Sequence, residues 1–210
     1  MNDYIDFNEG LWELCKYQHD LIKQYKEFIE KTILVIENMH KNGGKLLLAG
    51  NGGSCSDCEH ISGELLKGFR SKRKPSAEDT KGLESEIADK LQLGIGAVPL
   101  ASLTALSSAF NNDVDPNLTF SQLVFALGKK EDVFMGLSTS GNAKNICNAV
   151  KVAKSKGLLT IGLTGEKGGE LGNLCDITIK VPETETYKVQ ELHLPTYHAI
   201  CAQVEYDIFG

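Results

Sequence analysis

The chain has 210 residues, with 22 lysine and arginine residues against 28 aspartate and glutamate residues, for a formal net charge of −6. This length is typical of a single domain with a sizeable hydrophobic core. The acidic balance argues against a general binder of nucleic acid or membrane surfaces, and no apolar run approaches the roughly 20 residues of a membrane span. The six cysteines are too sparse for a disulfide framework, and the first residues lack a signal-peptide pattern, so we expect a cytoplasmic protein.

The first 42 residues are predicted to form a helical arm. Apolar residues recur mostly at steps of three and four, and Gly43 and Gly44 end the pattern. A long amphipathic helix must pack against something, so the arm either covers the sheet or forms an interface between subunits. The predicted stripe comprises Leu11, Leu14, Cys15, Leu21, Ile22, Tyr25, Phe28, Ile29, Thr32, Ile33, Ile36 and Met39.

Residues 43–210 alternate between short apolar runs and helical stretches. The predicted strands are Lys45–Ala49, Gly94–Val98, Asp132–Ser138, Leu158–Leu163 and Cys175–Val181. The predicted helices are Cys55–Gly68, Ser102–Asn111, Ala143–Lys156 and about Tyr187 to Phe209. Apolar strands that alternate with helices predict an α/β fold, a doubly wound parallel sheet of five strands with helices on both faces.

A polar segment from about residue 70 to residue 93 interrupts this pattern. It begins with the basic run Lys72, Arg73 and Lys74, then becomes acidic, and it is nearly free of large apolar residues. This composition predicts a solvent-exposed, mobile insertion. The alternative is a lid that becomes ordered over a ligand.

Two loops rich in glycine and hydroxyl groups follow predicted strands. In open parallel sheets ligands bind beyond the carboxyl ends of the strands. The first loop, GNGGS at Gly50–Ser54, matches neither a Walker A loop nor the dinucleotide fingerprint, but its backbone can approach a ligand closely. The second, STSGN at Ser138–Asn142, places three hydroxyl groups at the start of a helix. Helix amides and hydroxyl groups can hold a phosphate monoester without a nearby lysine, so this loop predicts a phosphate site.

Groups able to transfer protons or bind a metal occur in two helical stretches. His60 and Glu64 are four residues apart and share one helix face. Such a pair is half of a metal site, a base with its partner, or an ordinary surface pair. The second stretch contains Gln190, Glu191, His193 and His198.

The CxxC pair of Cys55 and Cys58 is a weaker signal for metal. A structural zinc site normally needs a second pair of this kind, and the chain has none. The pair also overlaps the first loop, so we predict that it is incidental.

Together these motifs resemble the SIS (sugar isomerase) family. GNGGS followed by His60 and Glu64, then STSGN, then a Gln-Glu-Leu-His segment ending at His198, is similar to the bacterial phosphoheptose isomerases within that family. The resemblance runs from the N-terminal helix to the final helix, interrupted by the insertion. It implies a flavodoxin-like SIS fold over residues 43–210. It also implies a phosphosugar ligand and a homotetramer with the N-terminal helices in its core and active sites between chains.

The resemblance further implies a reaction and the residues that perform it. Sedoheptulose 7-phosphate would be converted to D-glycero-D-manno-heptose 7-phosphate through an enediol, on the route to ADP- or GDP-heptose for lipopolysaccharide or capsule. Glu64 matches the family's base and His198 its acid. The implied zinc ligands are His60, Glu64, Gln190 and His198. The implied substrate contacts are Asn51, Gly52, Gly53, Ser54, Asp113, Ser138, Thr139, Ser140 and Gln190.

One spacing complicates the implied zinc site. Gln190 and His198 are eight residues apart, about 12 Å along a helix axis, so both reach one metal only with extended side chains, a distorted helix or help from a neighbouring subunit. Pro195 lies between them and predicts a kink or a late helix start.

Three departures and three alternatives accompany the resemblance. Ala143 stands where the family usually has a serine, Tyr187 where an acidic pocket residue is common, and the basic insertion is unusual. The alternatives are an isomerase for another phosphosugar, a SIS binding protein that associates with the replication initiator, and a sugar-phosphate-sensing regulator. The last needs a DNA-binding domain for which 210 residues leave no room, whereas the presence of both Glu64 and His198 favours catalysis.

Overall fold

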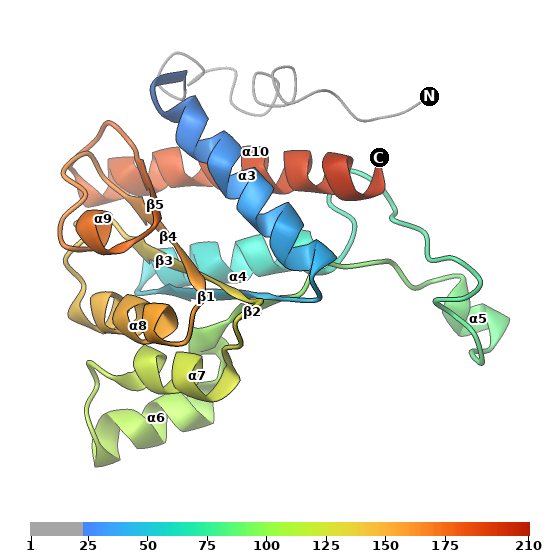
Figure 1. The fold of residues 1–210 in the computed structure, drawn as a ribbon, viewed down its shortest axis with the longest axis horizontal. Coiled ribbons are helices and arrows are strands. Elements are labelled where there is room, and N and C mark those ends of the chain that lie inside the picture. The colour runs from blue at the N-terminus through green and yellow to red at the C-terminus, as the bar shows by residue number, and fades with distance from the viewer. Residues whose placement is uncertain (1–22) are drawn as a thin grey trace.

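The computed structural model describes residues 23–210, which form a parallel sheet of five strands with helices on both faces (Figure 1). The strands are β1 (Leu46–Gly50), β2 (Ala97–Pro99), β3 (Val133–Ser138), β4 (Leu159–Thr164) and β5 (Ile177–Lys180). Their order is β2-β1-β3-β4-β5, and each neighbouring pair is parallel. The predicted doubly wound, flavodoxin-like sheet is therefore confirmed.

Helices cover the two faces of this sheet in separate layers (Figure 1). One layer contains α3 (Lys26–Lys41), α4 (Gly53–Leu66) and α10 (Thr186–Phe209). The other contains α7 (Thr119–Leu127) and α8 (Lys144–Ser155), with α6 (Thr104–Asp113) outside α7. The short elements are η1 (Lys23–Tyr25), η2 (Leu100–Ser102), α5 (Ser85–Ala88) and α9 (Leu171–Leu174). Each layer buries its own cluster of apolar side chains against the sheet.

The helical arm is represented in the described residues by η1 and α3. Helix α3 crosses α10 and buries Ile29, Ile33, Ile36 and Met39 in the same core, so this part of the arm covers the sheet (Figure 1). Phe28 belongs to the predicted stripe but is 40% exposed. The predicted helix upstream of residue 23 lies outside the described residues.

Helix α7 was not among the predicted elements. Its sequence, TFSQLVFAL, is only nine residues long, and a short apolar run does not distinguish a buried helix from a strand. Burial of Phe120, Leu123 and Val124 against the sheet decides in favour of a helix. The preceding helix α6 has no buried residue.

The insertion leaves the end of α4 and projects from the body, with α5 at its far end (Figure 1). Helix α5 has no buried residue, as the polar composition predicts. The prediction of solvent exposure is wrong for Arg73, because its side chain and that of Glu205 on α10 are both 0% exposed and form an ion pair of 2.6 Å. The basic start of the insertion is therefore an anchor on the body of the protein.

Helix α10 continues through Pro195 and already begins at Thr186, so the late start is wrong and the alternative, a kink at Pro195, stays a prediction. Proline lacks the N–H group that would continue the helical ladder. The next residue, Thr196, donates from its hydroxyl group to the Leu192 carbonyl at 2.7 Å. Gln190 and His198 therefore lie on one helix, two turns apart.

Candidate active site

A pocket of about 350 Å³ lies where the loops after β1 and β3 meet the start of α10. The order β2-β1-β3 makes this the switch point of the sheet, where chain connections leave in opposite directions and ligands bind. The lining includes eight of the nine predicted substrate residues, namely Asn51, Gly52, Gly53, Ser54, Ser138, Thr139, Ser140 and Gln190. Leu137, Ala143 and Thr186 complete it, and sequence reasoning had not assigned Leu137 or Thr186 to the site.

The backbone of the first loop is shaped by glycine. Gly52 has a φ of 55°, in the left-handed region that glycine adopts at little cost. At Gly53 an added β-carbon would lie 2.5 Å from Nε2 of Gln190, so a larger residue there would displace the end of this side chain. Asn51 exchanges two hydrogen bonds with Asn145, at 3.0 and 2.9 Å, which join the first loop to the start of α8.

The hydroxyl groups and two helix starts make the pocket suitable for an anion. Ser54 and Ser138 are buried, and α4 and α8 begin beside them, so the positive ends of two helix dipoles lie at the pocket. Ala143 is the N-cap residue of α8 and gives no side-chain hydrogen bond, so the departure noted in the sequence removes one hydroxyl from this wall. A phosphate here would be held by neutral donors.

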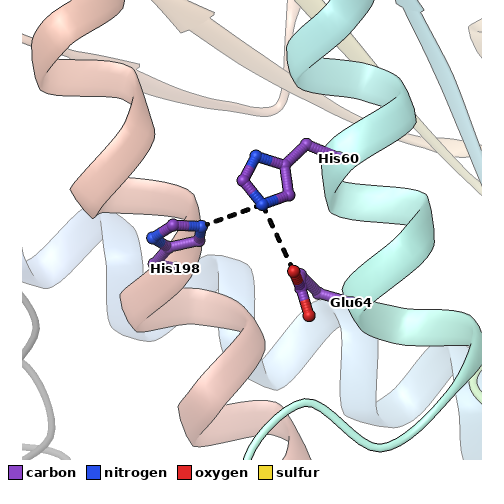
Figure 2. Close-up of side chains that lie close together, drawn as sticks. All are labelled: His60, Glu64 and His198. Carbon is purple, nitrogen blue, oxygen red and sulfur yellow. Dashed lines mark hydrogen bonds and ion pairs between the residues drawn. The ribbon is translucent and has the colours of Figure 1, made fainter.

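Further along α4, His60 and Glu64 meet His198 of α10 (Figure 2). Nε2 of His60 lies 3.2 Å from Oε1 of Glu64 and 3.3 Å from Nε2 of His198. One ligand atom from each of the three residues lies within 4.8 Å of the others. Helical spacing predicted the first pair, whereas His198 is 138 residues from His60 and reaches the cluster because α10 packs on α4.

Imidazole nitrogens and a carboxylate oxygen are the donors that zinc prefers in proteins. The three side chains therefore fit a divalent metal. The side chain of Gln190 lies against Gly53 at the start of α4, and its part as a fourth ligand stays a prediction.

Burial changes the pKa of histidines in and near this cluster. It lowers the pKa of His198, with a further lowering from His60 and an opposing effect of Glu64. A histidine whose pKa is lowered is neutral at pH 7 and still donates an N–H hydrogen bond. His193 lies outside the cluster and is fully buried, which lowers its pKa to about 4.

Two further residues contact the cluster and were not predicted, Tyr197 and Asp57. The Tyr197 hydroxyl oxygen lies 2.9 Å from Nδ1 of His60 and donates to Oδ1 of Asp57 at 3.3 Å. Burial raises the pKa of Asp57 to about 6, against the opposing effect of the tyrosine hydrogen bond. Asp57 precedes His60 by one helical turn, a spacing that could have pointed to it, whereas nothing in the sequence marks Tyr197.

Asp113 and the CxxC pair lie outside this arrangement. Asp113 ends α6 and does not line the described pocket, and its carboxylate accepts a hydrogen bond from Asn112 at 2.8 Å. Its substrate contact stays a prediction. Cys58 is buried in the core and burial raises its pKa well above the usual range, which disfavours the thiolate needed to bind metal.

Comparison with known proteins places the chain in a family. The family model described as "SIS domain" matches residues 99–205. "Phosphoheptose isomerase 2" of Campylobacter jejuni is 41% identical over 182 residues, covering 87% of this chain and 81% of the relative. "Phosphoheptose isomerase" of Aneurinibacillus thermoaerophilus is 37% identical over 213 residues, covering 100% and 96%.

A solved structure shows the same likeness. Phosphoheptose isomerase from Neisseria gonorrhoeae superposes with a TM-score of 0.74 at 29% identity, covering 92% of this chain and 94% of that one. Among the described residues, no helix combines the length and apolarity needed to cross a membrane. This chain belongs to the phosphoheptose isomerase family of SIS-domain proteins.

Proposed function

We propose that this protein interconverts sedoheptulose 7-phosphate and D-glycero-D-manno-heptose 7-phosphate. The observation that carries the proposal is the position of the His60, Glu64 and His198 cluster relative to the anion pocket. His60 follows Ser54 by six residues on α4, about 9 Å of helix rise. A substrate with a phosphate at one end and a carbonyl at the other matches this separation.

Glu64 and His198 supply the proton transfers. The Glu64 carboxylate removes a proton from C1 of the ketose while an N–H group of His198 donates to the carbonyl oxygen on C2. This gives the enediol. Return of the carboxyl proton from Glu64 to C2, with transfer of the O1 hydroxyl proton to the deprotonated nitrogen of His198, then produces the aldose and restores both groups. The anion pocket holds the phosphate through both steps, so the reacting carbons stay beside the two groups.

His60, Glu64 and His198, with Gln190 as the expected fourth ligand, would hold a zinc ion. When bound there, zinc polarises the carbonyl and stabilises the negative charge of the enediolate. The donor set and its separations of 3.2 and 3.3 Å support this assignment.

Incubation of the protein with sedoheptulose 7-phosphate, followed by NMR, tests the activity. We expect the aldose 7-phosphate to appear, chelation of zinc to stop turnover, and added zinc to restore it. Elemental analysis of protein purified without chelator is expected to give roughly one zinc per chain. A His60→Ala variant should lose the metal, whereas His40→Ala on α3 should retain it. Zinc content near zero, with turnover insensitive to chelators, would reject the metal, and absence of turnover would reject the activity.

We also infer a homotetramer with α3 in its core. Phe28 and Leu34 support this, since they are 40% and 57% exposed on the outer side of a helix whose inner side is buried. Light scattering during size-exclusion chromatography is expected to give four times the chain mass of 22.9 kDa. A monomeric mass would contradict the assembly, and Leu34→Glu, but not the exposed Leu83→Glu, should weaken it.

A cytoplasmic location and a role in making activated heptose complete the proposal. Among residues 23–210 all five cysteines are free, as is usual in reducing compartments. Loss of lipopolysaccharide or capsule heptose after deletion of the gene would support the role, and an unchanged heptose content would contradict it.

A further inference from the structure

The hydrogen bond at Nδ1 of His60 determines whether Nε2, the other ring nitrogen, carries a proton. Nε2 of His60 faces the Glu64 carboxylate and Nε2 of His198, at 3.2 and 3.3 Å (Figure 2). If Nε2 carries the proton, His60 donates to Glu64 and the two form an ordinary hydrogen-bonded pair. If Nδ1 carries it, the bare Nε2 and the carboxylate both present lone pairs to the same region, which suits a cation, and without a cation an N–H of His198 can donate to this Nε2.

The position of the proton depends on Tyr197, whose hydroxyl oxygen lies 2.9 Å from Nδ1 of His60. A tyrosine hydroxyl has one proton to donate and can also accept. Its second neighbour is Oδ1 of Asp57, at 3.3 Å. A carboxylate only accepts, so the hydroxyl proton points to Asp57. The tyrosine oxygen is then left to accept from Nδ1–H of His60.

The burial of Asp57 strengthens this direction. Its other oxygen, Oδ2, is buried and has no hydrogen-bond partner in the described structure. The Tyr197 hydroxyl is therefore the one side-chain donor that the described residues provide to this half-buried carboxylate, and withdrawing it would leave the carboxylate without a side-chain hydrogen bond.

The rings around His60 hold it in this geometry. The Tyr197 ring packs edge-on against His60 at 5.4 Å between centroids and against His198 at 5.0 Å. Tyr197 itself is buried in the core between α4 and α10. A rotation of the His60 ring would lose both the ring contact and the hydrogen bond to the tyrosine.

We propose that Asp57 and Tyr197 are positioning residues that keep the His60 proton on Nδ1 and so present Nε2 as a bare ligand to a divalent cation held with Glu64 and His198. Neither residue touches the cation or the substrate. Outer partners of this kind set the tautomer of metal-binding histidines, and their loss typically weakens metal affinity by about 10- to 100-fold. The inference rests on the metal site of the proposed function and assigns the residues that prepare it.

The first measurement uses the intact, metal-free protein. The ¹⁵N chemical shifts of a histidine ring distinguish the two tautomers, and comparison with a His60→Gln variant assigns the signals. We expect Nδ1–H at His60. A proton on Nε2 in the unaltered protein would overturn the proposal, and this measurement needs no positioning variant to fold.

Two conservative variants then distinguish the contribution of Tyr197 from that of Asp57. Tyr197→Phe removes the acceptor for Nδ1–H, so a mixture of tautomers is expected. Asp57→Asn introduces an amide that donates to the tyrosine oxygen and turns the hydroxyl proton toward Nδ1, so the His60 proton should move to Nε2. Tyr206→Phe removes a hydroxyl from the same helix, α10, and should leave the His60 tautomer unchanged.

Zinc affinity, measured by competition with a chelator, gives the second readout. We expect a loss of about 10- to 100-fold for Tyr197→Phe and Asp57→Asn, and none for Tyr206→Phe. Unchanged tautomer and unchanged affinity in both positioning variants would refute the proposal. The ring signals are read without substrate, so a protein that shows Nδ1–H but no turnover would refute the proposed function alone.

Discussion

Replacement of Glu64 by glutamine (Glu64→Gln) is expected to abolish interconversion of the ketose and aldose phosphates. The amide keeps the size and polarity of the side chain but cannot take a proton from carbon, and general base catalysis typically contributes 10²- to 10⁴-fold. The Glu64 side chain is 17% exposed, so it is not part of the fully buried core. We therefore expect the variant to retain the fold. The measurement is turnover by NMR, with circular dichroism and size-exclusion chromatography to confirm the fold and assembly.

The matched control for this experiment is Glu59→Gln on the same helix. Glu59 is exposed and accepts a hydrogen bond from the Ser102 hydroxyl at 2.9 Å, away from the cluster. Its variant should retain turnover. Normal turnover by Glu64→Gln would remove Glu64 from the role of base.

Loss of either partner of the buried ion pair between Arg73 and Glu205 is expected to lower the stability of the protein strongly. Arg73 donates from Nε to Glu205 at 2.6 Å and from its two terminal nitrogens to the carbonyls of Leu65 and Glu64, at 2.7 and 3.1 Å. Removing one partner of a buried pair leaves an uncompensated charge, which typically costs about 3–5 kcal/mol. We expect Arg73→Met and Glu205→Gln each to lower the free energy of unfolding by that order, measured by urea denaturation.

Glu205 also accepts from the backbone N–H groups of Phe69, Arg70 and Ser71, at 2.8, 2.7 and 3.2 Å. A double replacement by apolar residues would leave these three donors without their acceptor. We therefore expect the double variant Arg73→Met/Glu205→Met to remain destabilised, unlike buried pairs whose apolar replacement is neutral.

An exposed ion pair in the same insertion serves as the comparison. Lys90 and Glu86 lie 3.3 Å apart with side chains 73% and 83% exposed, so Lys90→Met should leave stability unchanged. A loss from Arg73→Met no larger than that from Lys90→Met would contradict the anchoring role. The pair also joins the end of α4 to α10, the helices that carry Glu64 and His198.

Local patterns in the sequence were sufficient for the sheet and for most of the anion pocket. Each strand is a short apolar run that ends in a turn, and in a parallel sheet the carboxyl ends of all strands lie at one edge. Both loops therefore lie at this edge, and the position of β1 beside β3 in the sheet brings Ser54 and Ser138–Ser140 into the lining of one pocket. Helical spacing likewise put His60 and Glu64 on one face of α4.

Contacts between distant segments decided the rest. Nothing local distinguishes Arg73 from its basic neighbours, because its burial depends on Glu205, 132 residues further along the chain. In the sequence, Tyr197 and Asp57 look like any other helical residues. The packing of α10 on α4 brings the Tyr197 hydroxyl to His60 and Asp57. The sequence by itself thus determined which groups are available for phosphate binding and proton transfer. Only the tertiary structure decided which of them share a site and where the His60 proton is held, since hydrogen-bond partners and burial arise from packing between helices.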